Sequence, residues 1–167
     1  ILGLTMALGF SGCQSENQKN QDAYRKIGIN SMAEGDYDKA VKSFQKALDT
    51  SLGKIGAEEI DICYYKAAAQ FAKKDYDGAI ETYTSLIDYD KENANAYYLR
   101  GSVYLDTDKK DKAFKDYKNA VKYAGREYEI YEGIYENLTN KGETEEAKNY
   151  LKKALDIKPK DGADYAE

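Results

Sequence analysis

The chain has 167 residues, enough for one compact domain or one short repeat array, and its 42% hydrophobic and 33% charged residues are typical of a folded globular protein. A formal net charge of −5 disfavours nucleic-acid phosphates and anionic lipid headgroups as partners. There is no histidine, which excludes Ser-His-Asp and Cys-His nucleophiles and most zinc sites, so we expect neither a cofactor nor a metal.

The first predicted element is a targeting segment at residues 1–13. Residues 1–10 (ILGLTMALGF) are apolar but shorter than the roughly 20 residues that cross a bilayer. A short apolar stretch of this kind is typical of the central part of a signal peptide. We therefore interpret residues 1–13 as the remnant of a signal peptide.

A cysteine closes this segment. Ser11 and Gly12 precede Cys13, and the polar residues 14–20 follow it. The arrangement resembles the lipobox of bacterial lipoproteins, with Phe10 where leucine is usual. The resemblance implies lipid attachment at Cys13 and a polar tether over residues 14–20. It also implies that the protein is lipid-anchored at the cell membrane, outside the cytoplasm. An ordinary signal peptide with a fortuitous Cys13 is the alternative.

An alanine recurs at a fixed spacing along the rest of the chain. Ala79, Ala113 and Ala147 are 34 residues apart, and Ala40 lies 39 residues before Ala79. Twelve positions before these alanines stand small residues, at Gly28, Ala67 and Gly101. Four positions after them stand aromatic residues, at Phe44, Tyr83 and Tyr117. Small side chains let two helices approach closely, and a buried aromatic ring contributes roughly 1.5 to 3 kcal/mol. With one proline in the whole chain, the pattern predicts stacked helical hairpins.

The predicted helices follow from this period. We expect first helices near residues 21–33, 58–73, 94–106 and 127–140, and second helices near 37–49, 76–89, 110–124 and 144–157. These recurring small, alanine and aromatic positions resemble the pattern of the tetratricopeptide-repeat (TPR) family over residues 21–161. The resemblance implies an all-α fold, a right-handed α-solenoid of four helix-turn-helix units at 21–54, 60–93, 94–127 and 128–161, with a loop insertion at 55–59.

Several positions depart from the family pattern. Lys66 and Arg100 replace apolar residues, and we expect their stems to be buried and their charged heads exposed. Tyr135 occupies a normally small place, so the helices of unit four should lie farther apart or rotate. Cys63 lies inside a predicted helix and is expected to be buried and inert.

The last six residues, 162–167, form a tail or the start of a fifth unit, because Tyr165 lies 34 residues after Tyr131. Three interpretations are open. The chain is truncated, or unit four caps itself, or its open side docks another subunit and makes an oligomer.

The resemblance also implies a ligand-binding groove. In the family, places 2, 5, 9 and 12 of each unit point into the concave face, as one helical stripe. In this chain the places hold Asp22, Arg25, Ile29 and Met32; Asp61, Tyr64, Ala68 and Phe71; Asn95, Tyr98, Ser102 and Leu105; and Glu129, Glu132, Glu136 and Thr139. The groove is expected to be apolar and aromatic in its middle and acidic at its C-terminal end.

The function implied is a non-enzymatic scaffold that binds a protein or peptide with apolar or aromatic anchors and a basic flank. We expect no binding of C-terminal carboxylates, because Ile29 and Leu99 do not match the clamp that some family members use. The alternative is a glycan-binding protein or carboxylate-dependent hydrolase of the cell envelope, using the glutamates with Tyr64 and Tyr98.

Simpler interpretations stand beside these. Tyr64, Phe71 and Tyr98 are also explained by packing between units, and the glutamates by a solvated helix face. Lys115, Lys118 and Lys122 form a basic stripe on a second helix, which we attribute to solubility.

Overall fold

The computed structural model describes residues 16–157, and within them it contains eight α-helices and no strand. The helices are α1 (Glu16–Ala33), α2 (Tyr37–Thr50), α3 (Ala57–Ala72), α4 (Tyr76–Tyr89), α5 (Ala94–Asp106), α6 (Lys110–Tyr123), α7 (Tyr128–Asn140) and α8 (Thr144–Ile157). Among the described residues no helix is long and apolar enough to cross a membrane. The prediction of an all-α fold is confirmed.

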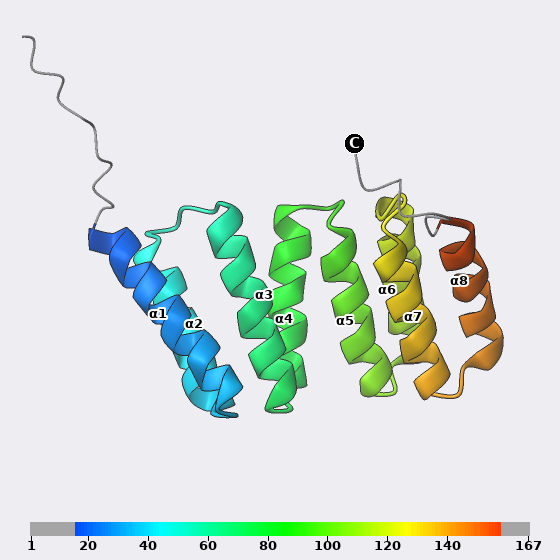
Figure 1. Ribbon diagram of the computed structural model, residues 1–167, viewed down its shortest axis with the longest axis horizontal. Coiled ribbons are helices and arrows are strands. Elements are labelled where there is room, and N and C mark those ends of the chain that lie inside the picture. Colours follow the sequence, from blue (N-terminus) through cyan, green and yellow to red (C-terminus); the bar gives the residue numbers. More distant parts are fainter. Residues whose placement is uncertain (1–15, 158–167) are drawn as a thin grey trace, which may run out of the picture.

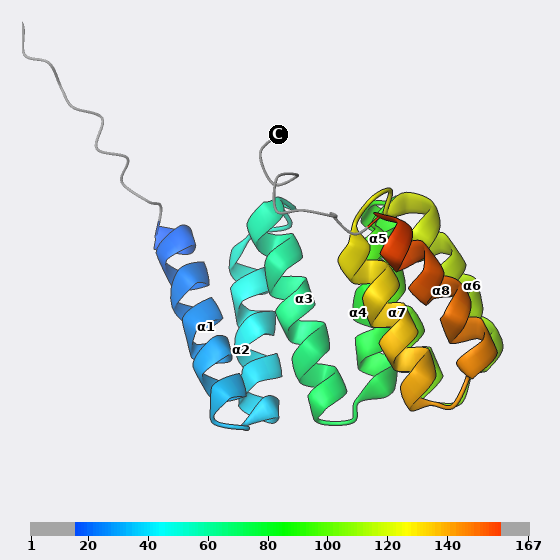
Figure 2. The same cartoon turned by 45° about the vertical axis from the view of Figure 1, so that its right-hand side comes forward.

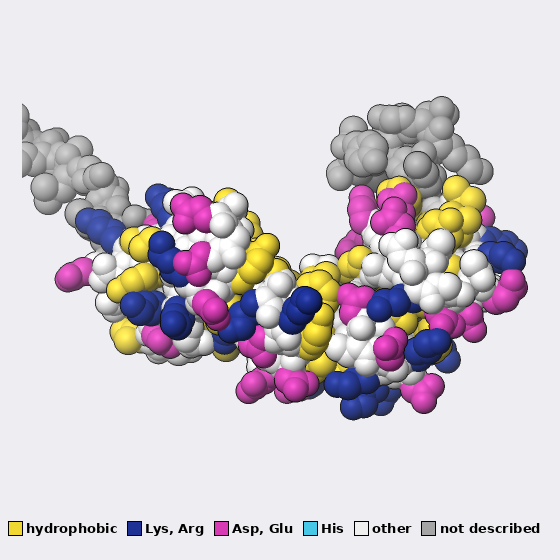
Figure 3. Space-filling view, turned by 90° about the horizontal axis from the view of Figure 1, so that it is seen from below, with side chains coloured by type: hydrophobic (Ala, Val, Ile, Leu, Met, Phe, Trp, Pro, Cys, Tyr) yellow, Lys and Arg dark blue, Asp and Glu magenta, His cyan; other side chains and the backbone are white. Residues whose placement is uncertain are grey.

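The helices form a row of antiparallel pairs (Figures 1 and 2). Each helix packs mainly on its neighbours in the chain, and α1 with α3 and α5 with α7 also meet. The loops between units lie along the edge at which α1 begins (Figure 1). Seen from below, the row is hollowed on one side between its two ends (Figure 3). This is the α-solenoid that the 34-residue period predicts.

The starts of the helices follow from local capping. Asp36 and Asp75 precede α2 and α4, and their carboxylates accept hydrogen bonds from the backbone N–H groups of Lys39 and Gly78, at 3.0 and 3.1 Å. Asn93 caps α5 in the same way. Each bond satisfies a backbone donor that has no partner inside the helix. Short polar residues therefore set where α2, α4 and α5 begin, whereas Lys109 and Glu127, which precede α6 and α7, make no side-chain cap bond.

The recurring small residues lie in the core. Ala40, Ala79, Ala113 and Ala147 are each at most 1% exposed. A Cβ atom at Gly28 would lie 2.5 Å from the ring of Phe44, which shows how tightly α1 and α2 approach there. The buried residues fall into three clusters that follow one another along the row, at α1–α3, α3–α5 and α5–α8. Stacking of units therefore makes one elongated core.

Two predicted boundaries are wrong. The first helix begins at Glu16 rather than 21, so residues 16–20 of the expected tether are helical. The Gln18 side chain donates to the carboxylate of Glu58, at 2.6 Å, and this bond ties the extra turn to α3. The helix α3 begins at Ala57, inside the expected 55–59 insertion, because the Glu59 carboxylate accepts a hydrogen bond from the Gly56 N–H at 2.8 Å. The loop therefore spans residues 51–56.

The expectation for Arg100 is also wrong. Its side chain is 16% exposed and forms two hydrogen bonds to the buried carboxylate of Asp116, at 2.7 and 2.8 Å. The guanidinium is stable in this buried position because its two hydrogen bonds to the carboxylate replace the hydrogen bonds to water that it loses on folding. Lys66 behaves as predicted, since its ammonium group reaches Gln45 on the exposed surface.

Candidate functional site

The predicted ligand-facing residues lie on the first helices, α1, α3, α5 and α7, and all except one keep accessible surface. The exception is Leu105, which is 2% exposed and lies in the same core cluster as Tyr117 and Ile134. The prediction of Leu105 as a groove residue is wrong, because its side chain packs between units three and four. We call the accessible set the first-helix face: Asp22, Arg25, Ile29, Met32, Asp61, Tyr64, Ala68, Phe71, Asn95, Tyr98, Ser102, Glu129, Glu132, Glu136 and Thr139.

An ion pair joins the first two helices of this face. The Arg25 guanidinium on α1 bonds to the Asp61 carboxylate on α3 through two nitrogens, with the Nε contact at 3.0 Å. It also lies 5.4 Å from the centre of the Tyr65 ring. The hydrogen bond to Asp61 raises the pKa of Arg25. Arg25 is therefore a bridge between units and already has a carboxylate partner.

Aromatic side chains occupy the middle of the face. The Tyr64 hydroxyl donates to the Asn93 side-chain oxygen at 2.7 Å, and its ring lies 6.3 Å from that of Tyr83. Phe71 packs edge-on against Tyr76, with ring centres 5.7 Å apart. Burial raises the pKa of Tyr64. Both rings therefore pack on α4, the second helix of their own unit, and both keep part of their surface exposed; a ligand role for them stays a prediction.

Contacts between α5 and α7 fix the next part of the face. The Asn137 amide donates to the Ser102 hydroxyl at 2.8 Å. The Tyr98 phenol lies directly over Gly133, where a Cβ atom would collide with its hydroxyl. Burial raises the pKa of Tyr98. Asn95, which begins this stretch, is exposed.

The acidic end lies on α7 alone. Glu129 and Glu136 are exposed, and Glu132 is half-buried. A hydrogen bond to Glu132 raises the pKa of Tyr128 to about 12. In the part of the chain that the structure describes, no group of three or more acidic or cysteine side chains could hold a metal ion. The arrangement offers negative charge to a ligand.

Some residues of the site were not predicted. Asn93, Gly133 and Asn137 position Tyr64, Tyr98 and Ser102, yet they stand outside the four groove places of the family. The capping role of Asn93 was a usable signal, because asparagine before a helix is a common cap. The close approach at Gly133 depends on tertiary packing and has no local signal.

The loop 51–56 also builds an apolar pocket that the sequence did not indicate. Its volume is about 250 Å³, and it is lined by Leu48, Ser51, Gly53, Lys54, Ile55, Glu59, Ile60, Cys63, Ser85, Leu86 and Tyr89. Cys63 is half-buried and free, and burial raises the pKa of its thiol. The raised pKa disfavours the thiolate. The prediction that Cys63 is buried is wrong, because its side chain keeps accessible surface, and its inertness stays a prediction. Cys13 and the other predicted targeting residues lie outside the described residues.

Three family models match the chain. Two are described as tetratricopeptide repeat, over residues 25–84 and over residues 94–126 and 136–161, and one as TPR repeat, over residues 67–108. Together they cover well over half of the chain. The chain belongs to the tetratricopeptide-repeat family. Comparison with curated protein sequences gives no match.

Solved structures of TPR proteins resemble this chain in fold. MamA is 26% identical, with a TM-score of 0.64 over 83% of this chain and 78% of its own. TTC0263, a thermophilic TPR protein from Thermus thermophilus, is 19% identical, with a TM-score of 0.64 over 83% of this chain and 74% of its own. YrrB, a TPR protein with an unusual peptide-binding site, is 18% identical, with a TM-score of 0.60 over 84% of this chain and 70% of its own. These similarities show the TPR solenoid fold.

Proposed function

We propose that this TPR chain is a non-enzymatic scaffold that binds a protein or peptide along its first-helix face. One observation carries the proposal: partly exposed side chains of the first helices are held in place by hydrogen bonds that run from one first helix to the next, or to the cap residue that precedes the next. The crossing bonds are Arg25 with Asp61, Tyr64 with Asn93, and Ser102 with Asn137. A surface whose side chains are already ordered loses less entropy when a ligand binds.

The chemistry of the face specifies the kind of ligand. Ile29, Met32, Ala68 and Phe71 offer apolar surface in units one and two, while α7 carries three glutamates. An apolar or aromatic side chain of a peptide would contact the first part, and a basic flank would lie along α7. YrrB offers a precedent for peptide binding by a TPR protein.

A hydrolase is less well supported. Glu129, Glu132 and Glu136 lie on one helix, whereas paired glycosidase carboxylates flank the bond that they cleave. Tyr64 and Tyr98, the expected sugar platforms, are half-buried and packed on Tyr83 and Gly133. Hydrolysis of cell-wall glycans by the purified chain, lost in Glu132→Gln, would contradict the scaffold proposal.

We also propose that Cys13 carries a lipid that tethers the scaffold to a membrane outside the cytoplasm. The lipobox resemblance supports the proposal, and Cys13 stands three residues before the start of α1. A chain of that length reaches at most about 10 Å, so the solenoid would lie close to the bilayer. Metabolic labelling with an alkyne fatty acid should mark the wild type and leave Cys13→Ser unmarked; equal labelling of both would reject the tether.

Binding to the first-helix face is tested by chemical cross-linking and pull-down of partners from native membranes. Tyr64→Ala/Tyr98→Ala should lose partners, and Glu129→Lys/Glu136→Lys should lose those with a basic flank. The matched controls are Tyr37→Ala/Tyr89→Ala and Glu34→Lys/Glu81→Lys, which change residues away from the face. Circular dichroism checks that every variant stays helical. Recovery of the same partners by wild type and both face variants would reject the assignment.

A further inference from the structure

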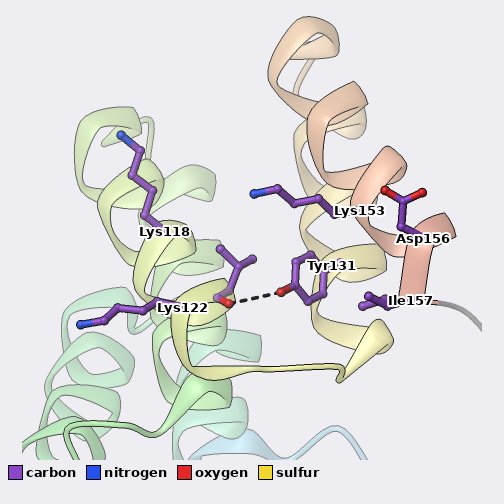
Figure 4. Close-up of a pocket in the computed structure, with 7 residues that line it drawn as sticks. Lys118, Lys122, Tyr131, Lys153, Asp156 and Ile157 are labelled. Atoms are coloured by element: carbon purple, nitrogen blue, oxygen red, sulfur yellow. Dashed lines mark hydrogen bonds between the residues drawn. The ribbon is translucent and has the colours of Figure 1, made fainter.

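A cleft lies between two second helices, α6 and α8, and includes no residue of the first-helix face. It has a volume of about 780 Å³ and is lined by Phe114, Lys118, Val121, Glu146, Asn149, Tyr150, Lys152, Lys153 and Asp156. A hollow of about 410 Å³ continues it, because the two share Lys118, Val121, Lys153 and Asp156. Figure 4 shows this end, with Lys153 extending from α8 toward α6. We call the whole the α6–α8 cleft.

The two walls are helical stripes that face each other. On α6 the lining residues are Phe114, Lys118, Val121 and Lys122, and on α8 they are Glu146, Asn149, Tyr150, Lys152, Lys153, Asp156 and Ile157. Their spacings of three, four and seven place each set on one side of its helix. The cleft therefore runs along the two helices and suits an elongated ligand.

The floor is apolar and anchored in the core. Tyr131 of α7 lies at the base (Figure 4). Its hydroxyl proton is shared between the carbonyl oxygens of Val121 and Gly125, both 3.2 Å from the phenol oxygen. The Tyr150 ring packs edge-on against the buried Tyr117 ring, with centres 6.4 Å apart. Since both tyrosines are fixed by these contacts, the floor is present before any ligand arrives.

The rim carries an excess of positive charge. Four exposed lysines, Lys118, Lys122, Lys152 and Lys153, stand against two carboxylates, those of Glu146 and Asp156. In the described part of the chain, Lys118, Lys152 and Lys153 take part in no salt bridge, whereas other lysines of unit four, at 141 and 148, do. This local excess occurs in a chain whose net charge is −5, so it is a distinct electrostatic feature of the surface.

We propose that the α6–α8 cleft binds an acidic peptide segment that carries apolar or aromatic side chains. The unpaired lysines complement its carboxylates. The floor, Tyr131 and Tyr150, together with the apolar wall residues Phe114 and Val121, receives its apolar side chains. A simple anion would contact the rim and leave this floor in water. The proposal is independent of ligand binding at the first-helix face, and with both surfaces occupied the solenoid would bridge a basic-flanked and an acidic partner.

The test measures fluorescence anisotropy of a labelled synthetic peptide that alternates glutamate with leucine and phenylalanine, mixed with the full chain in detergent. Lys118→Glu/Lys153→Glu should weaken binding by about tenfold or more, and added salt should weaken it further. The matched control, Lys39→Glu/Lys42→Glu on the surface of α2, changes the net charge equally and should stay within about twofold of wild type. Both variants alter exposed residues, so folding should be retained.

A second peptide of equal charge, with serine at every apolar position, tests the role of the floor. It should bind about tenfold more weakly than the first. Equal affinity for both peptides, equal binding by the cleft variant, or no binding by the wild type would overturn the proposal. Preference for vesicles of anionic lipid over the peptide would overturn it too, by assigning the cleft to headgroups. None of these results bears on Tyr64 and Tyr98, whose variants test the first-helix face separately.

Discussion

Arg100 illustrates how a charge is held inside this solenoid. Its guanidinium bonds to Asp116 on α6 and to the Thr84 hydroxyl on α4, at 2.9 Å, and it lies within 6 Å of the ring centres of Tyr97 and Tyr104. The hydrogen bond to Asp116 raises the pKa of Arg100. One cation therefore joins units two and three.

Removing Asp116, the partner of Arg100, should lower the stability of the fold. Asp116→Ala leaves a largely buried guanidinium without a counter-charge, so we expect the free energy of unfolding to fall by about 3 to 5 kcal/mol. The measurement is urea unfolding followed by circular dichroism. Asp111→Ala, which removes an exposed aspartate from the same helix, should cost less than about 1 kcal/mol. Similar losses in both variants would show that the ion pair is not the cause.

Tyr117 should make the free energy of unfolding depend on pH. Burial raises its pKa to about 12, and burial also raises the pKa of Tyr83. A phenol whose pKa is higher in the folded state stabilises fully below its unfolded pKa of about 10 and loses that contribution as the pH rises through about 12. For Tyr117 the loss amounts to about 2 to 3 kcal/mol.

Urea unfolding between about pH 9 and about pH 11.5 measures this effect. Stability of the wild type should fall across the range, and the fall should be shallower in Tyr117→Phe, which keeps the ring and removes the ionisable group. Tyr89→Phe removes a phenol that is 55% exposed and should retain the wild-type slope. A Tyr117→Phe slope equal to that of the wild type would contradict the assignment to this buried phenol.

At the scale of the site, the spacing of residues predicted which side chains lie on the first helices but not how they are bonded. Leu105 occupies a groove place by periodicity, yet it is buried because α7 packs over α5. Arg25 matched a ligand-binding place and is engaged by Asp61 from the next unit. Bonds between units depend on how neighbouring units stack on each other. The spacing of residues within one unit does not specify that stacking.

The turn inside each helix pair is the clearest feature at the scale of elements. The same position has a left-handed backbone in all four units, at Gly35, Lys74, Asp108 and Gly142, with φ between 58 and 80°. Glycine adopts this conformation without a steric penalty, whereas a residue with a Cβ atom loses roughly 1 to 2 kcal/mol. Unit two therefore holds a strained turn at Lys74, and the turn of unit three at Asp108 is less strained, because aspartate tolerates this conformation better than lysine.

Exchanging glycine and lysine between two of these turns tests the point. Lys74→Gly should raise the free energy of unfolding by about 0.5 to 1 kcal/mol, because relief of strain exceeds the extra entropy of glycine in the unfolded chain. Gly35→Lys should lower it by a similar amount, and since no atom lies within 4 Å of a Cβ at Gly35, only the backbone can be responsible. Thermal unfolding measures both, and changes of the same sign would contradict the interpretation.

Element boundaries were predictable where local chemistry sets them. Helices α2 and α4 start after capping aspartates in a repeated motif, and both begin where expected. The start of α1 was misplaced because residues 16–20 show no repeat column, and their helical turn is tied to Glu58 on another helix. Hydrogen bonds between residues far apart in the chain cannot be predicted from the local sequence.

The whole molecule is a row in which the two ends differ from the middle. Helix α8 buries only Ala147 and Ala154, and α1 buries Gln21, Gly28 and Ser31, while α5 buries five residues. In a solenoid each unit is stabilised by its neighbours, so a terminal helix has fewer stabilising contacts. Opening of the native state should begin at the ends.

Hydrogen exchange measured by mass spectrometry should resolve this order. Amides of α1 and α8 should exchange first and those of α3 to α6 last, because local opening is easiest where the least surface is buried. Equal rates in all eight helices would mean that the row opens as one cooperative unit. The same measurement separates the two binding surfaces. A basic-flanked peptide on the first-helix face should slow exchange in α1, α3, α5 and α7, and an acidic peptide in the α6–α8 cleft should slow it in α6 and α8.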